Sequence, residues 1–177
     1  MFEVFTTQTI KTKPTKKVVS FFIKVSYKLM VYGNFNISCL MYSAITSLMI
    51  SEKSVSKAFS SCDVKVKRKY YELKELYSIT NQSQKYRKQF EEHTQPKMPV
   101  IAFLLGDGVH LEEINNHIES SPKMLNTFKL EKVGVLVDSL YNAREIHYVF
   151  SVIQHVRCYL LSLIRCFVYF LVKMNFL

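Results

Sequence analysis

Glycine and proline are scarce in this chain, which has four of each among 177 residues. All-β proteins need turn residues about every 8–12 positions, so this scarcity argues against a sandwich or barrel and favours long helices. No run repeats at a fixed period, which excludes a solenoid. Hydrophobic residues make up 49% of the chain and aromatic residues 14%, which argues against intrinsic disorder. We therefore expect one all-α domain with a substantial core.

Cysteines are also few, and their spacing does not pair them. The four cysteines include no CxxC pair and are too sparse for a disulfide framework. Residues 1–9 lack the positive segment and apolar stretch of a secretory signal. Both features indicate a reducing, cytoplasmic compartment in which the cysteines are ordinary buried thiols. The cysteines are Cys39, Cys62, Cys158 and Cys166.

The chain lacks an uncharged run long enough to cross a bilayer. Its most apolar stretch, residues 158–177, is divided by Arg165 and Lys173 into runs of seven residues. A membrane span needs about 20 apolar residues, so we expect a buried or peripheral helix here. Contact with a membrane surface, with the two cations reaching toward lipid phosphates, is the alternative.

Acidic residues are outnumbered, and the formal charge is +10. Much of the excess lies in two clusters, and charge alone does not choose among nucleic acid, anionic lipid and an acidic protein. A nucleic-acid-binding protein would carry glycines or a recognised fold around its aromatic residues, and neither is present. We therefore expect no nucleic-acid partner. The clusters are Lys11, Lys13, Lys16 and Lys17, and Lys65, Lys67, Arg68 and Lys69.

Apolar residues recur at spacings of three and four along most of the chain, as on one face of a helix. Val18, Phe22, Val25 and Leu29 are an example, and Gly33 follows them as a stop signal. Residues 50–63 are serine-rich and poorly periodic, and residues 95–98 lie at two prolines that favour an extended connector. The expected helices are 15–32, 36–48, 64–79, 83–93, 100–113 and 126–145. The last two are joined by a polar turn and can lie side by side as an antiparallel hairpin.

Five short motifs, in this order, resemble the catalytic domain of Ras-type guanine-nucleotide exchange factors. GNFN is similar to the family's Asn-Asn-Phe-Asn signature, and KYRKQF contains its Tyr-Arg pair. Single motifs of this kind are weak signals, whereas their common order and spacing are specific. The resemblance covers about residues 16–163. The motifs are GNFN at 33–36, KYRKQF at 85–90, PVIAFLLGDGVHLEE at 99–113, Leu125, Asn126 and Lys129, and HYVFSVIQHVRCYLLSL from His147.

The resemblance implies an irregular, orthogonal bundle of helices from which a helical hairpin protrudes. On this basis we expect a basic, disordered segment over residues 1–14, a partial domain over 15–163 and an apolar tail over 164–177. The family's first helices are expected to be missing, so that the domain is truncated at its N-terminus.

The implied activity is exchange of the nucleotide of a Ras-family small GTPase, without covalent chemistry, metal or cofactor. An exchanger must bind the nucleotide-free state preferentially, which by linkage weakens nucleotide binding by the same factor. In the family, a carboxylate on the first hairpin helix replaces phosphate interactions, and an apolar side chain one turn earlier occludes the metal position. The matching residues are Glu113 and Val109. Further positions implied to contact the GTPase are Asn34, Asn36, Leu105, Asp107 and Glu112.

Two features leave other functions open. Gly106 and Gly108 stand where the family has Thr and Leu, and an interior glycine costs a helix about 1 kcal/mol relative to alanine. With the expected truncation, they motivate the alternative of a non-catalytic GTPase-binding or scaffold fragment. An enzyme would need a site such as His110, Glu113 and His117, which could align three metal ligands only if their helix continued past Asn115.

Overall fold

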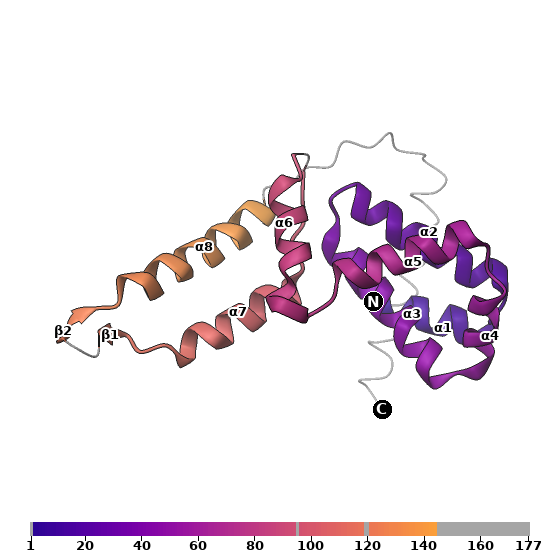
Figure 1. Ribbon diagram of the computed structural model, residues 1–177, viewed down its shortest axis with the longest axis horizontal. Helices are drawn as coiled ribbons and strands as arrows, with labels where there is room; N and C mark the ends of the chain where they lie inside the picture. The colour runs from indigo at the N-terminus through magenta and orange to yellow at the C-terminus, as the bar shows by residue number, and fades with distance from the viewer. Residues whose placement is uncertain (1, 95, 119–120, 145–177) are drawn as a thin grey trace, which may run out of the picture. The chain divides into compact units, whose positions relative to one another are not determined.

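Residues 2–94, 96–118 and 121–144 are described in the computed structural model of the chain, shown in Figure 1. The chain divides into two compact units, residues 1–146 and 147–177. The second unit, with the expected closing helix and the tail 164–177, lies outside the described residues. Within the described ranges, eight α-helices, one 3-10 turn and one two-stranded ribbon occur, and the expected all-α class is confirmed.

The first five helices are packed against one another. They are α1 (Phe2–Thr12), α2 (Lys16–Val31), α3 (Phe35–Ser51), α4 (Lys53–Ser60) and α5 (Val64–Leu76). The remaining elements are η1 (Thr80–Ser83), α6 (Gln84–Glu92), α7 (Ile101–Glu113), β1 (His117–Ile118), β2 (Ser121–Leu125) and α8 (Thr127–Arg144). Each helix expected from the periodicity within the described residues is present, with ends that differ by at most a few positions.

The ends of α2 follow from its local sequence. The Thr15 side chain accepts a hydrogen bond from the Val18 N–H at 3.4 Å, which caps the first turn. Gly33 adopts φ +77° at the other end, a left-handed conformation that costs glycine nothing. The Gly33 N–H then donates to the Met30 carbonyl, and the Asn34 N–H donates to the Leu29 carbonyl. These two bonds form a Schellman motif, which stops the helix and turns the chain into α3.

Two apolar clusters hold the helices together. The first is built from α1 to α5, and Ile10, Val19, Ile23 and Val55 in it are fully buried. The second joins the end of α2 and the start of α3 to α5, α6 and the beginning of α7. Its members are Met30, Phe35, Leu73, Leu76, Tyr77, Tyr86 and Val100. The second cluster is what connects the helical hairpin to the rest of the unit.

The first segment corrects an expectation, because residues 2–12 form helix α1 where we expected disorder over 1–14. Thr6 and Ile10, one helical turn apart, are 1% and 0% exposed, and α1 packs against α3. The expectation of disorder rested on Lys11 and Lys13. The segment is ordered because Thr6 and Ile10 are buried against the rest of the bundle. The serine-rich stretch 50–63, for which no structure was assigned, contains α4 with Val55 and Ala58 buried.

Helices α7 and α8 form the expected hairpin and run side by side (Figure 1). Their connection is more ordered than the polar turn we expected, because β1 and β2 pair antiparallel within it. Among the described residues, none of the helices combines the length and the apolarity required of a membrane span.

Candidate functional site

Helix α7 has one half-buried face and one exposed face. The half-buried positions recur at the spacing of one side of a helix. They are Phe103, Leu104, Asp107, Gly108 and Leu111. We call the exposed positions that the sequence singled out the α7 exposed stripe; they are Leu105, Val109, Glu112 and Glu113. Four of the seven predicted site residues therefore lie on one outward-facing surface.

Val109 and Glu113 lie one turn apart on this stripe, as their i, i+4 spacing requires. Val109 is 57% exposed, and the Glu113 side chain is 73% exposed. His110 Nδ1 lies 3.6 Å from Glu113 Oε2, close enough for an ion pair when the imidazole is protonated. An apolar side chain and a carboxylate are thus presented together to an incoming molecule.

The beginning of α7 is fixed by side chains from two other helices. The first N–H groups of a helix lack partners within it. Tyr86 Oη of α6 accepts a hydrogen bond from the Val100 N–H at 2.8 Å, and Asn36 Oδ1 of α3 accepts from the Ile101 N–H at 3.2 Å. Phe103 packs edge-on against the Tyr86 ring, with the ring centroids 5.1 Å apart. Asn36 therefore acts as a helix cap that is supplied from 65 residues away.

An ion pair strengthens this attachment on the half-buried face. Arg87 Nη2 of α6 donates to Asp107 Oδ1 of α7 at 2.6 Å, with both side chains partly buried. The hydrogen bond to Asp107 raises the pKa of Arg87, which favours the charged guanidinium. Asp107 therefore anchors α7 to α6, and its role in contacting a GTPase stays a prediction.

Asn34 also has a structural contact. Its Oδ1 accepts a hydrogen bond from the Ile37 N–H at 3.1 Å and caps α3. Both Asn34 and Asn36 lie near the first turn of α7, whereas Glu113 is in its last turn. Thirteen helical residues rise about 18 Å, so the structure does not bring the two asparagines together with Glu113. The predicted residues form two groups. One is the α7 exposed stripe, and the other, which we call the anchoring base, comprises Asn34, Asn36 and Asp107.

The far end of the hairpin is closed by Asn126, which precedes α8, and by Lys129 in the first turn of α8. Lys129 Nζ donates to the Ile114 carbonyl and to Asn116 Oδ1, both at 2.7 Å, which satisfies a carbonyl at the end of α7. Asn126 Oδ1 accepts from the Lys129 N–H at 3.2 Å and caps α8, while its Nδ2 donates to the Asn115 carbonyl at 3.1 Å. Both ends of α7 are therefore held, and Glu113 sits next to the second closure.

Four of the residues that hold α7 belong to the sequence motifs, and the motifs alone do not give them a structural role. Tyr86 and Arg87 are the Tyr-Arg pair, and Asn126 and Lys129 belong to the motif before α8. For Asn126 the residue type indicates this role, since asparagine before an apolar run favours a helix N-cap. The contacts of the other three depend on which helices meet, which no local pattern reveals.

Replacing Lys129 with methionine should loosen the hairpin end without removing a residue of the exposed stripe. The variant keeps the apolar stem but loses both hydrogen bonds, so local opening of the last turn of α7 should become easier by about 1 kcal/mol. Amide hydrogen exchange near Leu111 and Glu113 should then accelerate roughly fivefold. Lys132→Met is the matched control, because Lys132 Nζ lies over the Phe128 ring and not at the end of α7. Equal protection of these amides from exchange in Lys129→Met and Lys132→Met would contradict the role of Lys129 in closing the end of the hairpin.

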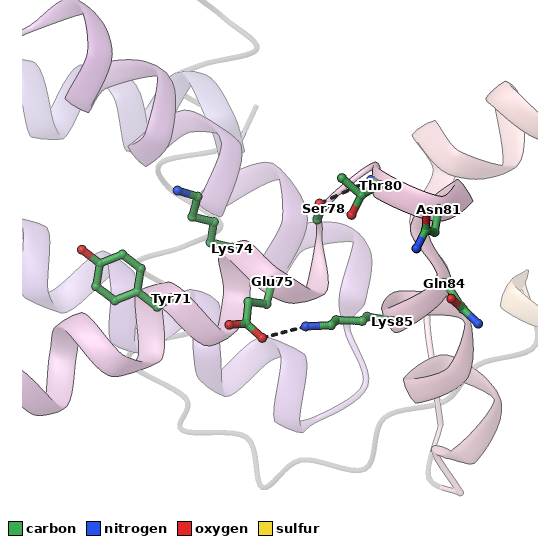
Figure 2. Close-up of a pocket in the computed structure, with 8 residues that line it drawn as sticks. All are labelled: Tyr71, Lys74, Glu75, Ser78, Thr80, Asn81, Gln84 and Lys85. Atoms are coloured by element: carbon green, nitrogen blue, oxygen red, sulfur yellow. Dashed lines mark hydrogen bonds and ion pairs between the residues drawn. The ribbon is translucent and has the colours of Figure 1, made fainter.

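A surface cavity of about 500 Å³ lies elsewhere, between the end of α5, η1 and the start of α6 (Figure 2). Its polar lining includes the ion pair of Lys85 Nζ with Glu75 Oε2 at 2.8 Å. None of the predicted site residues lines it, so it is not part of the candidate site. The lining residues are Tyr71, Lys74, Glu75, Ser78, Thr80, Asn81, Gln84 and Lys85.

The geometry bears on the metal-site alternative. Helix α7 ends at Glu113 and His117 lies in β1, so His110, Glu113 and His117 do not follow one another along a single helix. Within residues 2–94, 96–118 and 121–144, no group of three or more His, Cys, Asp or Glu side chains could hold a metal ion.

The family model of the RasGEF domain matches residues 2–131. The match begins in α1, runs through the anchoring base and the α7 exposed stripe, and ends in the first turns of α8. It thus includes residues 2–15, which lie before the first motif that resembles the family. Among curated proteins, no match to the chain was found.

Proposed function

Since the chain belongs to the RasGEF domain family, we propose that it promotes GDP release from a Ras-family small GTPase by inserting the hairpin α7–α8. RasGEF domains are exchange factors and not enzymes, and the family implies a Ras-family GTPase as partner. The observation that carries the proposal is the α7 exposed stripe, on which Val109 and Glu113 are presented together.

The proposed mechanism is differential binding. Glu113 takes over interactions that the nucleotide phosphates make with the GTPase, and Val109 fills the space near the metal position. Both contacts are available only when the nucleotide has left, so binding of the hairpin and binding of GDP oppose each other. Any factor by which GDP weakens hairpin binding is the factor by which the hairpin weakens GDP binding.

The two attachments of α7 support this mechanism energetically. A helix that is already held at its base by Asn36, Tyr86 and Arg87 and at its end by Lys129 loses little freedom on binding. Less of the interaction free energy is then spent on ordering, and more remains to displace the nucleotide.

Exposed apolar side chains on both hairpin helices support a protein partner. Large apolar residues that are more than half exposed occur along the hairpin, and exposed apolar surface of this kind is typical of protein interfaces. They are Leu105, Val109, Met124, Leu125, Phe128, Leu130, Val135, Val137 and Tyr141.

The direct test is GDP release measured on a panel of fluorescent-GDP-loaded GTPases of the Ras, Rap and Ral groups. We expect the chain to accelerate release from at least one of them in proportion to its concentration. Binding to the nucleotide-free GTPase without any acceleration would contradict the exchange activity and favour the non-catalytic scaffold.

Gly106 and Gly108 are the observation that favours this scaffold alternative, because they weaken the helix that must act as a wedge. Neither glycine is required by its surroundings. A Cβ at Gly106 would meet nothing within 4 Å, and one at Gly108 would lie 3.9 Å from Leu136 Cδ1, an ordinary contact. Neither residue has a positive φ.

The variant Gly106→Ala/Gly108→Ala should therefore stiffen α7 and stabilise the hairpin by about 2 kcal/mol. If helix flexibility limits exchange, GDP release should become faster, which is measured in the same fluorescence assay alongside thermal unfolding. Gly134→Ala in α8, where a Cβ also meets nothing within 4 Å, is the matched control for a general gain in helix stability. A stabilised variant with unchanged release kinetics would show that the glycines do not limit the activity.

A further inference from the structure

Helix α2 carries one row of exposed side chains along its whole length. The row is Lys17, Phe21, Lys24, Lys28 and Val31. On a helix of 3.6 residues per turn these positions fall within an arc of about 80°. Phe21 is 60% exposed and Val31 is 50% exposed. Lysine side chains can reach lipid phosphates while apolar side chains beside them enter the headgroup layer, so a row that carries both can meet an anionic membrane surface.

Helix α5 packs against α2 (Figure 1). Lys69 Nζ of α5 lies 4.8 Å from the centroid of the Tyr27 ring of α2, and Lys16 Nζ lies 2.7 Å from Asp63 Oδ1. The hydrogen bond from Lys16, with a smaller contribution from the charge of Lys24, lowers the pKa of the Asp63 carboxyl. The N-terminal ends of α2 and α5 are therefore adjacent, and the cations of the two helices share a surface.

We call this surface the α2–α5 basic face; it comprises Lys17, Phe21, Lys24, Lys28, Lys65, Arg68 and Lys69. The carboxylates near it are already engaged. Asp63 pairs with Lys16, and Glu72 Oε1 lies 3.4 Å from Arg68 Nε. Neither carboxylate is therefore left to neutralise the lysines of the α2 row, and the positive charge of these lysines surrounds the exposed Phe21 ring.

We propose that the α2–α5 basic face docks onto an anionic lipid bilayer, with Phe21 inserted among the headgroups and the lysines against the phosphates. Each cation near an anionic surface adds to the attraction, and long lysine side chains can reach phosphates while their stems cover apolar surface. The apolar members of the row select this occupant. A nucleic-acid backbone attracts the lysines equally but offers no apolar layer for Phe21 and Val31.

The test uses the full chain and sedimentation with two kinds of vesicle, phosphatidylcholine alone and phosphatidylcholine with phosphatidylserine. We expect binding to the phosphatidylserine vesicles that falls as salt is added. Lys24→Glu/Lys28→Glu should weaken this partitioning by at least about tenfold. Phe21→Ser leaves the charge unchanged and should still weaken it by several-fold.

The matched control is Lys53→Glu/Lys57→Glu, which makes the same change in charge on α4, where both lysines are exposed. It should weaken partitioning much less, and circular dichroism and thermal unfolding should report an intact fold for all variants. Equal losses for the two double variants, or unchanged binding after Lys24→Glu/Lys28→Glu, would overturn the proposal. The proposal would also be overturned if Lys24→Glu/Lys28→Glu weakened binding to duplex DNA while Phe21→Ser left vesicle binding unchanged.

The bilayer proposal is independent of the exchange mechanism. The basic face is formed by α2 and α5, and the residues proposed for exchange lie on α7. GDP release from a soluble GTPase should therefore be the same for Lys24→Glu/Lys28→Glu and the unaltered chain. Lost vesicle binding with unchanged solution exchange supports the bilayer proposal, whereas loss of both activities together would contradict this separation.

Discussion

Glu113→Ala should lower the acceleration of GDP release by about 100-fold, which corresponds to roughly 3 kcal/mol of lost coupling. The reason is that the carboxylate makes its proposed contacts only in the nucleotide-free complex, where water is excluded and a missing charge is not replaced. Because the side chain is 73% exposed in the free chain, the free energy of unfolding should change by less than about 0.5 kcal/mol. Stopped-flow fluorescence of nucleotide release measures the first quantity, and urea denaturation measures the second.

Two further variants sharpen this result. Glu113→Gln keeps the shape of the side chain and removes its charge, so a loss close to that of alanine would assign the effect to the carboxylate. Glu92→Ala removes a similarly exposed carboxylate from α6, where it pairs with Lys88, and controls for the change in net charge. A Glu113→Ala variant that still accelerates release as well as Glu92→Ala would remove the basis of the proposed mechanism.

Gly33→Ala should destabilise the chain by about 3 kcal/mol, the largest loss of stability we expect from a single methyl group. Gly33 has φ +77°, and a Cβ there would clash with the Pro96 carbonyl and lie 2.7 Å from His93 Nε2. The carbonyl belongs to the connector that leads into α7, and the Met98 N–H donates to the Gly33 carbonyl at 2.8 Å. The substitution therefore strains the backbone and also pushes the connector away.

Gly33→Asn separates these two causes, because asparagine tolerates the left-handed conformation better than alanine but still carries a Cβ. It should lose less stability than alanine and remain about 2 kcal/mol below the unaltered chain, as measured by urea denaturation. Gly106→Ala is the control, since the same added methyl group meets open space there and should be neutral or stabilising. A cost below about 1 kcal/mol for Gly33→Ala would show that the connector yields easily.

Several features of the fold could be predicted because they depend on neighbours in the sequence. Tyr70, Leu73 and Leu76 of α5 and Tyr77 at its C-terminal end are buried, as their helical spacing indicates. The shared face of Val109 and Glu113 follows from a spacing of four residues in any regular helix. The side-chain period of a helix was therefore enough to predict these features.

Other features could not be predicted because they depend on residues far apart in the chain. The order of α1 comes from Thr6 and Ile10 packing into the bundle, which the weakly periodic sequence of this segment does not predict. The division of the predicted site has the same origin. Nothing in the sequence around Asn36 shows that its side chain caps a helix beginning at Ile101.

The sequence by itself thus determined α2, α3, α5 and α6, the hairpin of α7 and α8, and the one-turn spacing of Val109 and Glu113, since hydrogen bonding and side-chain period within a helix are local. Only the tertiary structure decided that Glu113 is presented outward while Asp107 anchors α7 and Asn36 caps it; the cap that Asn34 forms on α3 is local. The physical reason is that a polar group meets its partner only where helices pack, and packing is set by the two apolar clusters as a whole.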